Sequence, residues 1–221
     1  MRLRRSLAAT ALVLLALPAG VAGAPRQALP PGWYRVSPLP ASLQARMVGR
    51  SWHAGCPVAL AQLRLLRVTF YGFDHRVHVG RMVVDATWAS RLGGVFVRLY
   101  RERFPIYEMV PVDAYGGNDS VSIDHDNTSS FNCRNATGSS SWSNHAYGLA
   151  VDLDPLQNPY LDHGRTTHRG SLRYLDRSQR LPGMIHPGDA TVQAFAAIGW
   201  GWGGSWSGSI QDLQHFSVNG R

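Results

Sequence analysis

The sequence has no lysine, so all 22 basic residues are arginines, and it has only two cysteines in 221 residues. It shows no glycine period and no sustained heptad, which excludes collagen-like and coiled-coil proteins. The formal net charge is +8, but no dense basic run accompanies it, so we expect no nucleic-acid partner. What remains is 44% hydrophobic residues, enough for the packed core of one ordinary domain.

The first 24 residues have the pattern of a secretory signal peptide. Arg2, Arg4 and Arg5 precede an apolar run over 6–17 that is too short to span a bilayer comfortably. Small residues follow, so we expect cleavage within 19–24, with an uncleaved membrane anchor as the alternative. The sequence therefore predicts a protein of the cell wall or of the medium, with no membrane-spanning segment after cleavage.

The rest of the chain is predicted to form an extended lead-in over 25–50 and one domain over 51–221. The lead-in is rich in proline and is expected to lie outside the core. The expected class is α+β: a small, mostly antiparallel sheet with helices packed on one side and long loops around one cleft. Patterns of apolar residues predict strands over 63–71, 77–84, 106–112, 149–153 and 215–218.

Two helices are predicted between these strands. The first is capped by Asp85 and stopped by Pro105, and the second runs from Asp189 to Ile198, with Gly199 directly after it. The polar stretch over 113–142 is long enough to suggest a functional loop, and we expect 155–188 to be a surface insertion.

The most informative stretch runs from Ser143 to Asp152. His145 precedes a turn at Gly148, and Asp152 lies on the strand that follows, beside the small side chain of Ala150. A carboxylate between apolar neighbours is costly to bury unless a cation or a donor meets it. An imidazole seven residues earlier, brought back by the turn, can reach the same point. Nitrogen and oxygen ligands of this kind suit zinc.

A second pair near the C-terminus completes this set. His215 supplies another imidazole, and Asp212 lies three residues before it. Two histidines and one carboxylate give three protein ligands and leave a fourth zinc position for water. A carboxylate that does not bind metal, here Asp212, can take a proton from that water and deliver it to a leaving amine.

These motifs resemble a known family. The pattern Ser-x-His-x-x-Gly-x-Ala-x-Asp, followed by Asp-x-x-His, is similar to zinc D-alanyl-D-alanine carboxypeptidases and peptidoglycan peptidases of the VanY type, which include VanX-like dipeptidases and L-alanyl-D-glutamate endopeptidases. The resemblance implies one zinc ion with the ligands His145, Asp152 and His215, and a base at Asp212. It makes 51–221 a zinc peptidase domain.

The family also holds the scissile carbonyl with an arginine before the first ligand. The best positional match is Arg134, and a guanidinium aimed at the developing oxyanion would stabilise it. Ser143 is expected to make a hydrogen bond near the site. A metal-free Ser-His-Asp hydrolase is the alternative, disfavoured because no Gly-x-Ser-x-Gly motif is present and the second histidine would be idle.

The cysteines, Asp154, the C-terminal tryptophans and the remaining histidines are expected to have structural or surface positions. Export favours a disulfide between Cys56 and Cys133, which we expect to hold the segment that presents Arg134. Asp154 is predicted to form the exit turn of its strand, with a paired-carboxylate glycosidase as the alternative. Tryptophans near the C-terminus could line a groove or pack in the core: Trp200, Trp202 and Trp206. The remaining histidines are expected in exposed positions: His53, His75, His78, His125, His163, His168 and His186.

The sequence therefore predicts an exported zinc metallopeptidase that acts on peptidoglycan stem peptides as a monomer. Release of a terminal D-Ala from D-Ala-D-Ala is the favoured reaction. One alternative is an endopeptidase of the same family that cuts L-Ala-D-Glu. Another is a wall-binding module that retains zinc but has no turnover.

Overall fold

The structure is a computed structural model, and it describes residues 30–221. The predicted signal peptide over 1–24 and the start of the lead-in lie outside the described residues. Within the described part, no helix combines the length and the apolar character that crossing a bilayer requires.

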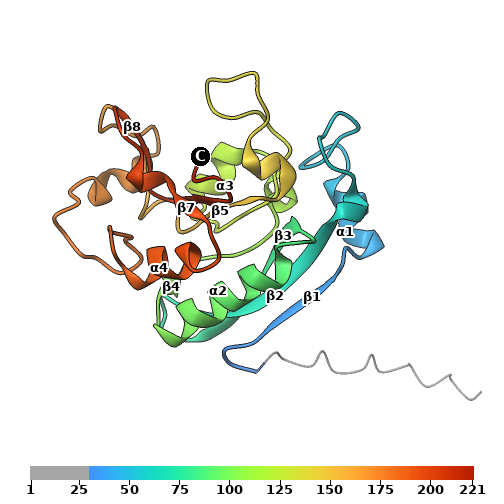
Figure 1. Ribbon diagram of the computed structural model, residues 1–221, viewed down its shortest axis with the longest axis horizontal. Helices are drawn as coiled ribbons and strands as arrows, with labels where there is room; N and C mark the ends of the chain where they lie inside the picture. Colours follow the sequence, from blue (N-terminus) through green and yellow to red (C-terminus); the bar gives the residue numbers. More distant parts are fainter. Residues whose placement is uncertain (1–29) are drawn as a thin grey trace, which may run out of the picture.

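The largest sheet contains the strands β1 (Tyr34–Pro38), β2 (Leu63–Gly72) and β3 (Val77–Asp85) in antiparallel order. A two-residue strand, β4 (Pro105–Ile106), pairs in parallel with the end of β2. In Figure 1, β2 is a long strand that runs from the region of α1 to that of β4. The predicted strands over 63–71 and 77–84 are confirmed.

Both faces of this sheet are buried. Leu66, Val68 and Phe70 point to one face and pack in the core that contains α2 (Ala89–Arg101). Leu63 and Leu65 point to the other face and join a second cluster of buried apolar residues. Alternate residues of a strand point to opposite faces of the sheet. Because both faces are buried here, β2 has apolar residues at odd and at even positions.

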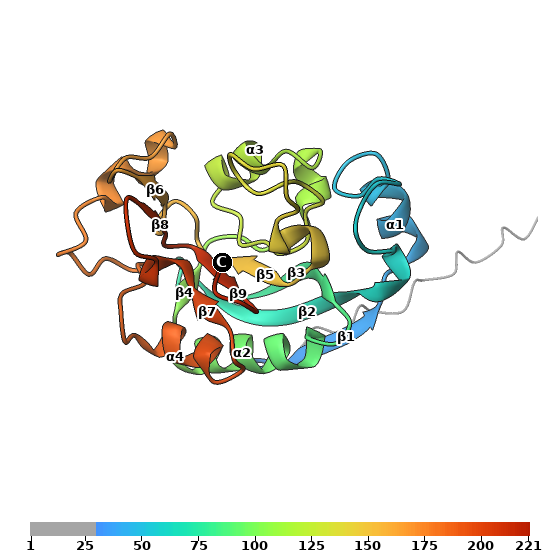
Figure 2. The same cartoon turned by 45° about the horizontal axis from the view of Figure 1, so that its top comes forward.

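The helices α2 and α4 (Ala190–Ala196) lie on the same side of the large sheet (Figure 2). This arrangement confirms the predicted α+β class. The first helix starts later than predicted, because Asp85 still belongs to β3 and its carboxylate accepts a hydrogen bond from the Thr87 amide at 2.8 Å. Gly199 follows the second helix with φ +86°, the left-handed conformation that ends helices.

The lead-in takes part in the core, contrary to our prediction. β1 pairs with β2 along its whole length. The short helix α1 (Ala41–Met47) buries Leu43 and Met47 against the second apolar cluster. Prolines at the ends of these elements therefore separate a strand from a helix and do not mark a peripheral segment.

A smaller antiparallel sheet holds β5 (Ala150–Asp152), β9 (His215–Ser217) and β7 (Gly201–Trp202) in this order. The remaining pair, β6 (Tyr160–Asp162) and β8 (Ile210–Asp212), is also antiparallel. One more short helix, α3, is Asp119–Asp124. Short 3-10 helices occur at Leu60–Gln62, Val112–Tyr115, Asn144–Tyr147, Arg169–Tyr174 and Gly203–Ser205.

Two segments differ from the prediction. The expected strand over 106–112 is wrong beyond Ile106, because the Val110 amide donates to the side-chain oxygen of Asn127 instead of a neighbouring strand. The segment over 155–188 is not simply a surface insertion. Ile185 is in the main core, and its amide donates to the buried Asn158 side chain at 2.7 Å.

Candidate metal centre

The first two candidate ligands are placed by a tight turn. Ser143 precedes the turn Asn144–Tyr147, and its hydroxyl accepts a hydrogen bond from the His145 amide at 3.2 Å. Gly148 then adopts φ +71°, and a Cβ atom there would lie 2.6 Å from the Asp85 amide nitrogen. Only glycine fits this close approach, which directs the chain into β5 and brings Asp152 to the site.

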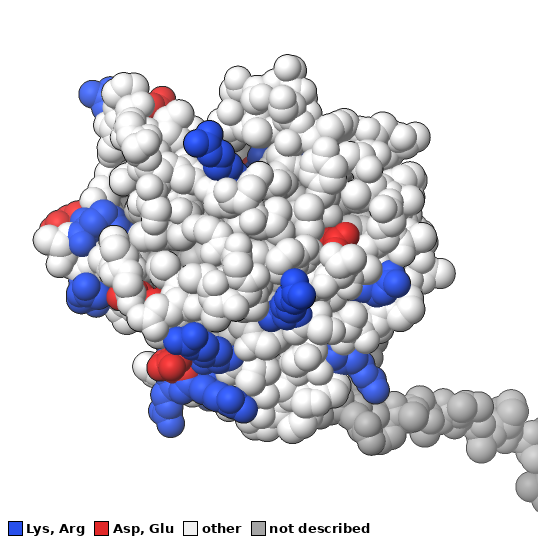
Figure 3. Space-filling view, viewed as in Figure 1, with Lys and Arg blue, Asp and Glu red and all other residues white. Residues whose placement is uncertain are grey.

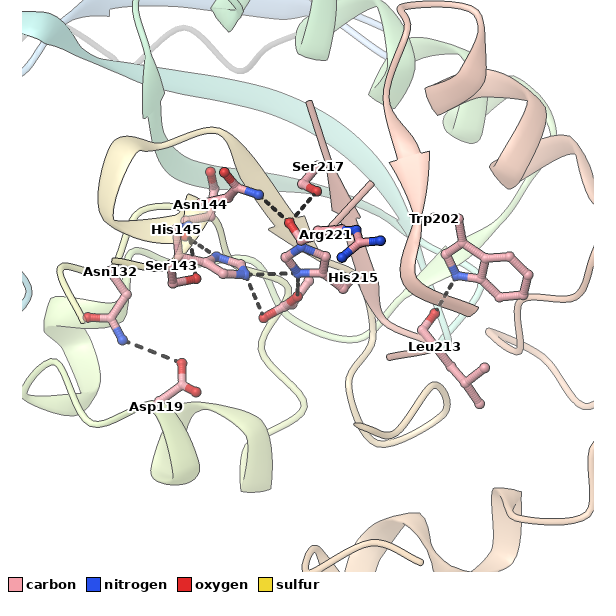
Figure 4. Close-up of polar contacts among 12 residues, drawn as sticks. Asp119, Asn132, Ser143, Asn144, His145, Trp202, Leu213, His215, Ser217 and Arg221 are labelled. Atoms are coloured by element: carbon pink, nitrogen blue, oxygen red, sulfur yellow. Dashed lines mark hydrogen bonds and ion pairs between the residues drawn. The ribbon is translucent and has the colours of Figure 1, made fainter. Parts of the chain in front are cut away.

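The third candidate ligand comes from the neighbouring strand. Asp152 of β5 and His215 of β9 are directly opposite each other in the antiparallel pair. The Asp152 Oδ1 atom lies 3.1 Å from Nδ1 of His215, and Oδ2 lies 3.1 Å from Nε2 of His145. The two imidazole nitrogens are 3.2 Å apart. Three side chains from distant parts of the chain thus converge on one point (Figure 4).

A hydrogen bond orients the first imidazole. Nδ1 of His145 lies 2.6 Å from the carbonyl oxygen of Ser130, so Nδ1 carries the proton and donates it. This tautomer leaves the lone pair of Nε2 directed at Asp152 and His215. Metal-binding histidines commonly have this arrangement, because the outer hydrogen bond fixes the ring and raises its basicity.

The three side chains fit a zinc ion in number, type and position. One ligand atom of each lies within 4.8 Å of the other two, and all three residues are buried. Burial alone would raise the pKa of the Asp152 carboxyl, but the adjacent His145 and His215 outweigh it, and the net pKa is lowered. Two imidazoles and a carboxylate are a donor set typical of zinc centres that keep one position open.

Asp212 lies next to this group, at the end of β8. Burial raises the pKa of the Asp212 carboxyl to about 7, and the negative charge of Asp152 adds to the rise. His215 and, to a smaller extent, the positive charge of Arg134 lower this pKa and so act in the opposite direction. The Oδ1 atom of Asp212 is shielded from solvent and has no hydrogen-bond partner among the described residues. A carboxyl with these properties can exchange a proton near neutral pH.

Arg134 lines the same pocket and is fixed from two sides. One of its terminal nitrogens lies 2.9 Å from Oδ2 of Asp119. The preceding residue, Cys133, forms the predicted disulfide with Cys56. The ion pair and the disulfide therefore hold the guanidinium close to Asp212.

The pocket above these residues has a volume of about 380 Å³. Its lining combines the two histidines and Asp212 with aromatic, aliphatic, polar and basic side chains: Arg134, Ala136, Thr137, Trp142, Ser143, Asn144, Tyr160, Trp206, Ile210, Asn219 and Arg221. Tyr160 stands opposite Asp212 in the β6–β8 pair. The pocket is thus large enough for part of a peptide.

Ser143 does not have the contact that a hydrolase triad requires. Its hydroxyl accepts from a backbone amide, whereas the His145 ring nitrogens face Ser130, Asp152 and His215. No hydrogen bond joins the serine hydroxyl to an imidazole nitrogen in residues 30–221.

Most of the remaining candidates lie outside the site. The histidine predictions are wrong for His186, which is buried beside Asp189, and His168 is half-buried against Asp124. Trp200 and Trp202 are in the core, while Trp206 lines the pocket. The other histidines are exposed: His53, His75, His78, His125 and His163.

Asp154 does more than form an exit turn. It has φ +43° and is fully buried, and its Oδ1 accepts from the Tyr107 amide at 3.0 Å. Burial raises the pKa of the Asp154 carboxyl well above its ordinary value, and the charge of Asp126 adds to this rise. Asp154 is not among the three residues whose ligand atoms converge, so it takes no part in the candidate centre.

Sequence reasoning missed Asp119 and Tyr160. Asp119 lies 15 residues before Arg134, at the start of α3, and no spacing rule links an acid to an arginine across such a loop. Tyr160 reaches the pocket only because β6 pairs with β8. Both contacts depend on the folded chain.

The fold and this group of residues are typical of a small α+β domain with a single metal centre. Residues 137–218 match the model of a family described as D-alanyl-D-alanine carboxypeptidase. The matched segment includes both motifs and begins after Arg134, and it confirms the resemblance seen in the sequence. Searches of curated proteins and of solved structures found no match.

Proposed function

We propose that the protein is a zinc-dependent peptidase that acts on peptidoglycan stem peptides. The observation that carries this proposal is the convergence of His145, Asp152 and His215 beside a peptide-sized pocket that the two histidines line. The family match supports a peptidase at the level of the class. A zinc ion held by these residues would act as a Lewis acid and would lower the pKa of water in the pocket.

The side chains around the ligands supply the remaining parts of the reaction. Asp212 accepts a proton from the attacking water and returns it to the departing amine, a role that its pKa of about 7 suits. Arg134 offers N–H donors to the carbonyl oxygen as negative charge develops on it. The ion pair with Asp119 keeps that guanidinium in place, so little reorganisation is needed during the reaction.

Among the reactions of this family, we propose release of a terminal D-Ala from D-Ala-D-Ala. Cleavage of L-Ala-D-Glu within a stem peptide is the second candidate. We further propose that the protein is exported and acts in the cell wall. The disulfide between Cys56 and Cys133 supports export, because such bonds persist in oxidising compartments.

A test of the proposed function compares the wild-type protein with Asp212→Ala. We expect the zinc-loaded wild-type protein to cleave a synthetic stem pentapeptide, and mass spectrometry of the products identifies which bond breaks. Asp212→Ala should lose activity by about 10²–10⁴-fold while its zinc content stays near that of the wild-type protein. Zinc binding by a wild-type protein that cleaves neither bond would favour the wall-binding module.

A further inference from the structure

The pocket contains two guanidinium groups that differ in their charge partners. Arg134 is paired with Asp119 at 2.9 Å. Arg221 lines the same pocket, but no Asp or Glu side chain within residues 30–221 lies within ion-pair distance of it. Its charge therefore remains available for a ligand.

The main chain of Arg221 is held firmly beside the metal centre. Its main-chain oxygen accepts hydrogen bonds from the Ser217 hydroxyl at 2.8 Å and from the side-chain amide of Asn144. Its amide donates to the side-chain oxygen of Asn219 at 3.1 Å. Ser217 ends β9, the strand that carries His215, and Asn144 directly precedes His145. The same two segments thus position Arg221 and two of the candidate ligands.

Arg221 also stands between two cavities. A second recess of about 440 Å³ adjoins the pocket and shares Trp206, Ile210 and Arg221 with it. Arg221 is therefore part of the wall that the pocket and the recess share. Figure 4 draws its guanidinium beside His215. In Figure 3, basic atoms border a hollow in the region where Figure 1 marks the C-terminus.

We propose that Arg221 binds the free α-carboxylate of the residue that follows the cleaved bond. A guanidinium binds a carboxylate through two parallel hydrogen bonds, which gives both affinity and direction. The inference rests on the proposed function, because the carboxylate is oriented relative to the same metal centre.

Two matched substrates test this role. The first is an acylated peptide that ends in D-Ala-D-Ala with a free carboxylate, and the second is the same peptide with a C-terminal amide. The wild-type protein should cleave the acid with a kcat/KM about tenfold or more above that of the amide, as expected for one lost charged hydrogen-bonding group. Arg221→Gln should bring this ratio close to one by raising the KM of the acid, and Arg221→Lys should restore part of it.

A matched control removes an arginine elsewhere. Arg101 is exposed at the end of α2 and lines neither cavity, so Arg101→Gln should keep the wild-type ratio. Thermal unfolding and zinc content of each variant verify that the fold and the metal centre are intact. An acid-to-amide ratio in Arg221→Gln equal to that of the wild-type protein would overturn the proposal.

The outcome can be separated from a failure of the proposed function. If the zinc-loaded wild-type protein cleaves neither peptide, the proposed activity fails, and calorimetric binding of the same two peptides still tests Arg221. Preferential binding of the acid that is lost in Arg221→Gln supports the carboxylate site. Equal binding of the acid and the amide to the wild-type protein rejects it.

Discussion

Asp119 and Arg134 form an ion pair of 2.9 Å at the wall of the pocket. The other oxygen of Asp119 lies 3.4 Å from the Asn132 side-chain nitrogen, as Figure 4 shows. The carboxylate therefore connects α3 to the segment that leads to Arg134. Its position indicates a role in orienting the guanidinium rather than in touching the substrate.

We expect Asp119→Asn to lower kcat by about tenfold, with a much smaller change in KM, because a loosened guanidinium stabilises the developing charge less well. Steady-state kinetics on a cleaved stem peptide measures both constants. Asp124→Asn, at the other end of α3, removes an exposed acid outside this pocket and should leave both constants unchanged. Equal losses in the two variants would assign the effect to the stability of α3.

Metal binding should release a proton from Asp212. In the metal-free protein the pKa of this carboxyl is raised to about 7, so part of the molecules hold the proton at neutral pH. A nearby divalent cation favours the carboxylate and lowers that pKa. Calorimetric titration with zinc in buffers of different ionisation enthalpy counts the protons. The wild-type protein should release more protons than Asp212→Asn, and equal release would contradict the assignment.

Asp154 should make the stability of the protein depend on pH. Its folded-state pKa is raised by burial, so above the ordinary value near 4 the folded state holds a proton that the unfolded state has lost. The free energy of unfolding then falls as the pH rises, by about 1.4 kcal/mol per pH unit until the folded carboxyl ionises.

Asp154→Asn removes this titration and keeps an oxygen for the Tyr107 amide. Asparagine also tolerates the positive φ of this position. Urea unfolding between pH 4 and pH 8 should show a stability gain over the wild-type protein that grows with pH. A gain that stays constant over this range would mean that the wild-type carboxyl is already ionised at pH 4.

Loss of the disulfide should affect both stability and turnover. The two cysteines are 77 residues apart, and bridges that close long loops contribute about 2–5 kcal/mol. The double variant Cys56→Ala/Cys133→Ala should lose stability by this amount in urea. It should also have a lower kcat in conditions where it is fully folded, because Cys133 adjoins Arg134. Unchanged turnover would show that Asp119 alone positions the guanidinium.

The sequence predicted the local parts of this structure better than its long-range contacts. The turn at Gly148 and the strand with Asp152 follow from chemistry within ten residues. The start of the long helix was wrong because pairing with β2 extends β3 to Asp85. The partner of Arg134 was missed because it depends on how a polar loop folds back.

Asp152 and His215 are directly opposite each other in the β5–β9 pair. A metal ion bound by both residues would therefore also affect folding. A shift of one residue between these strands would turn one of the two side chains to the opposite face and separate the donors. A metal ion bound by these residues would therefore stabilise a single alignment of two segments that are distant in the chain. Under the proposed export, a chain that folds after crossing the membrane would bind the metal only once this sheet is correctly aligned.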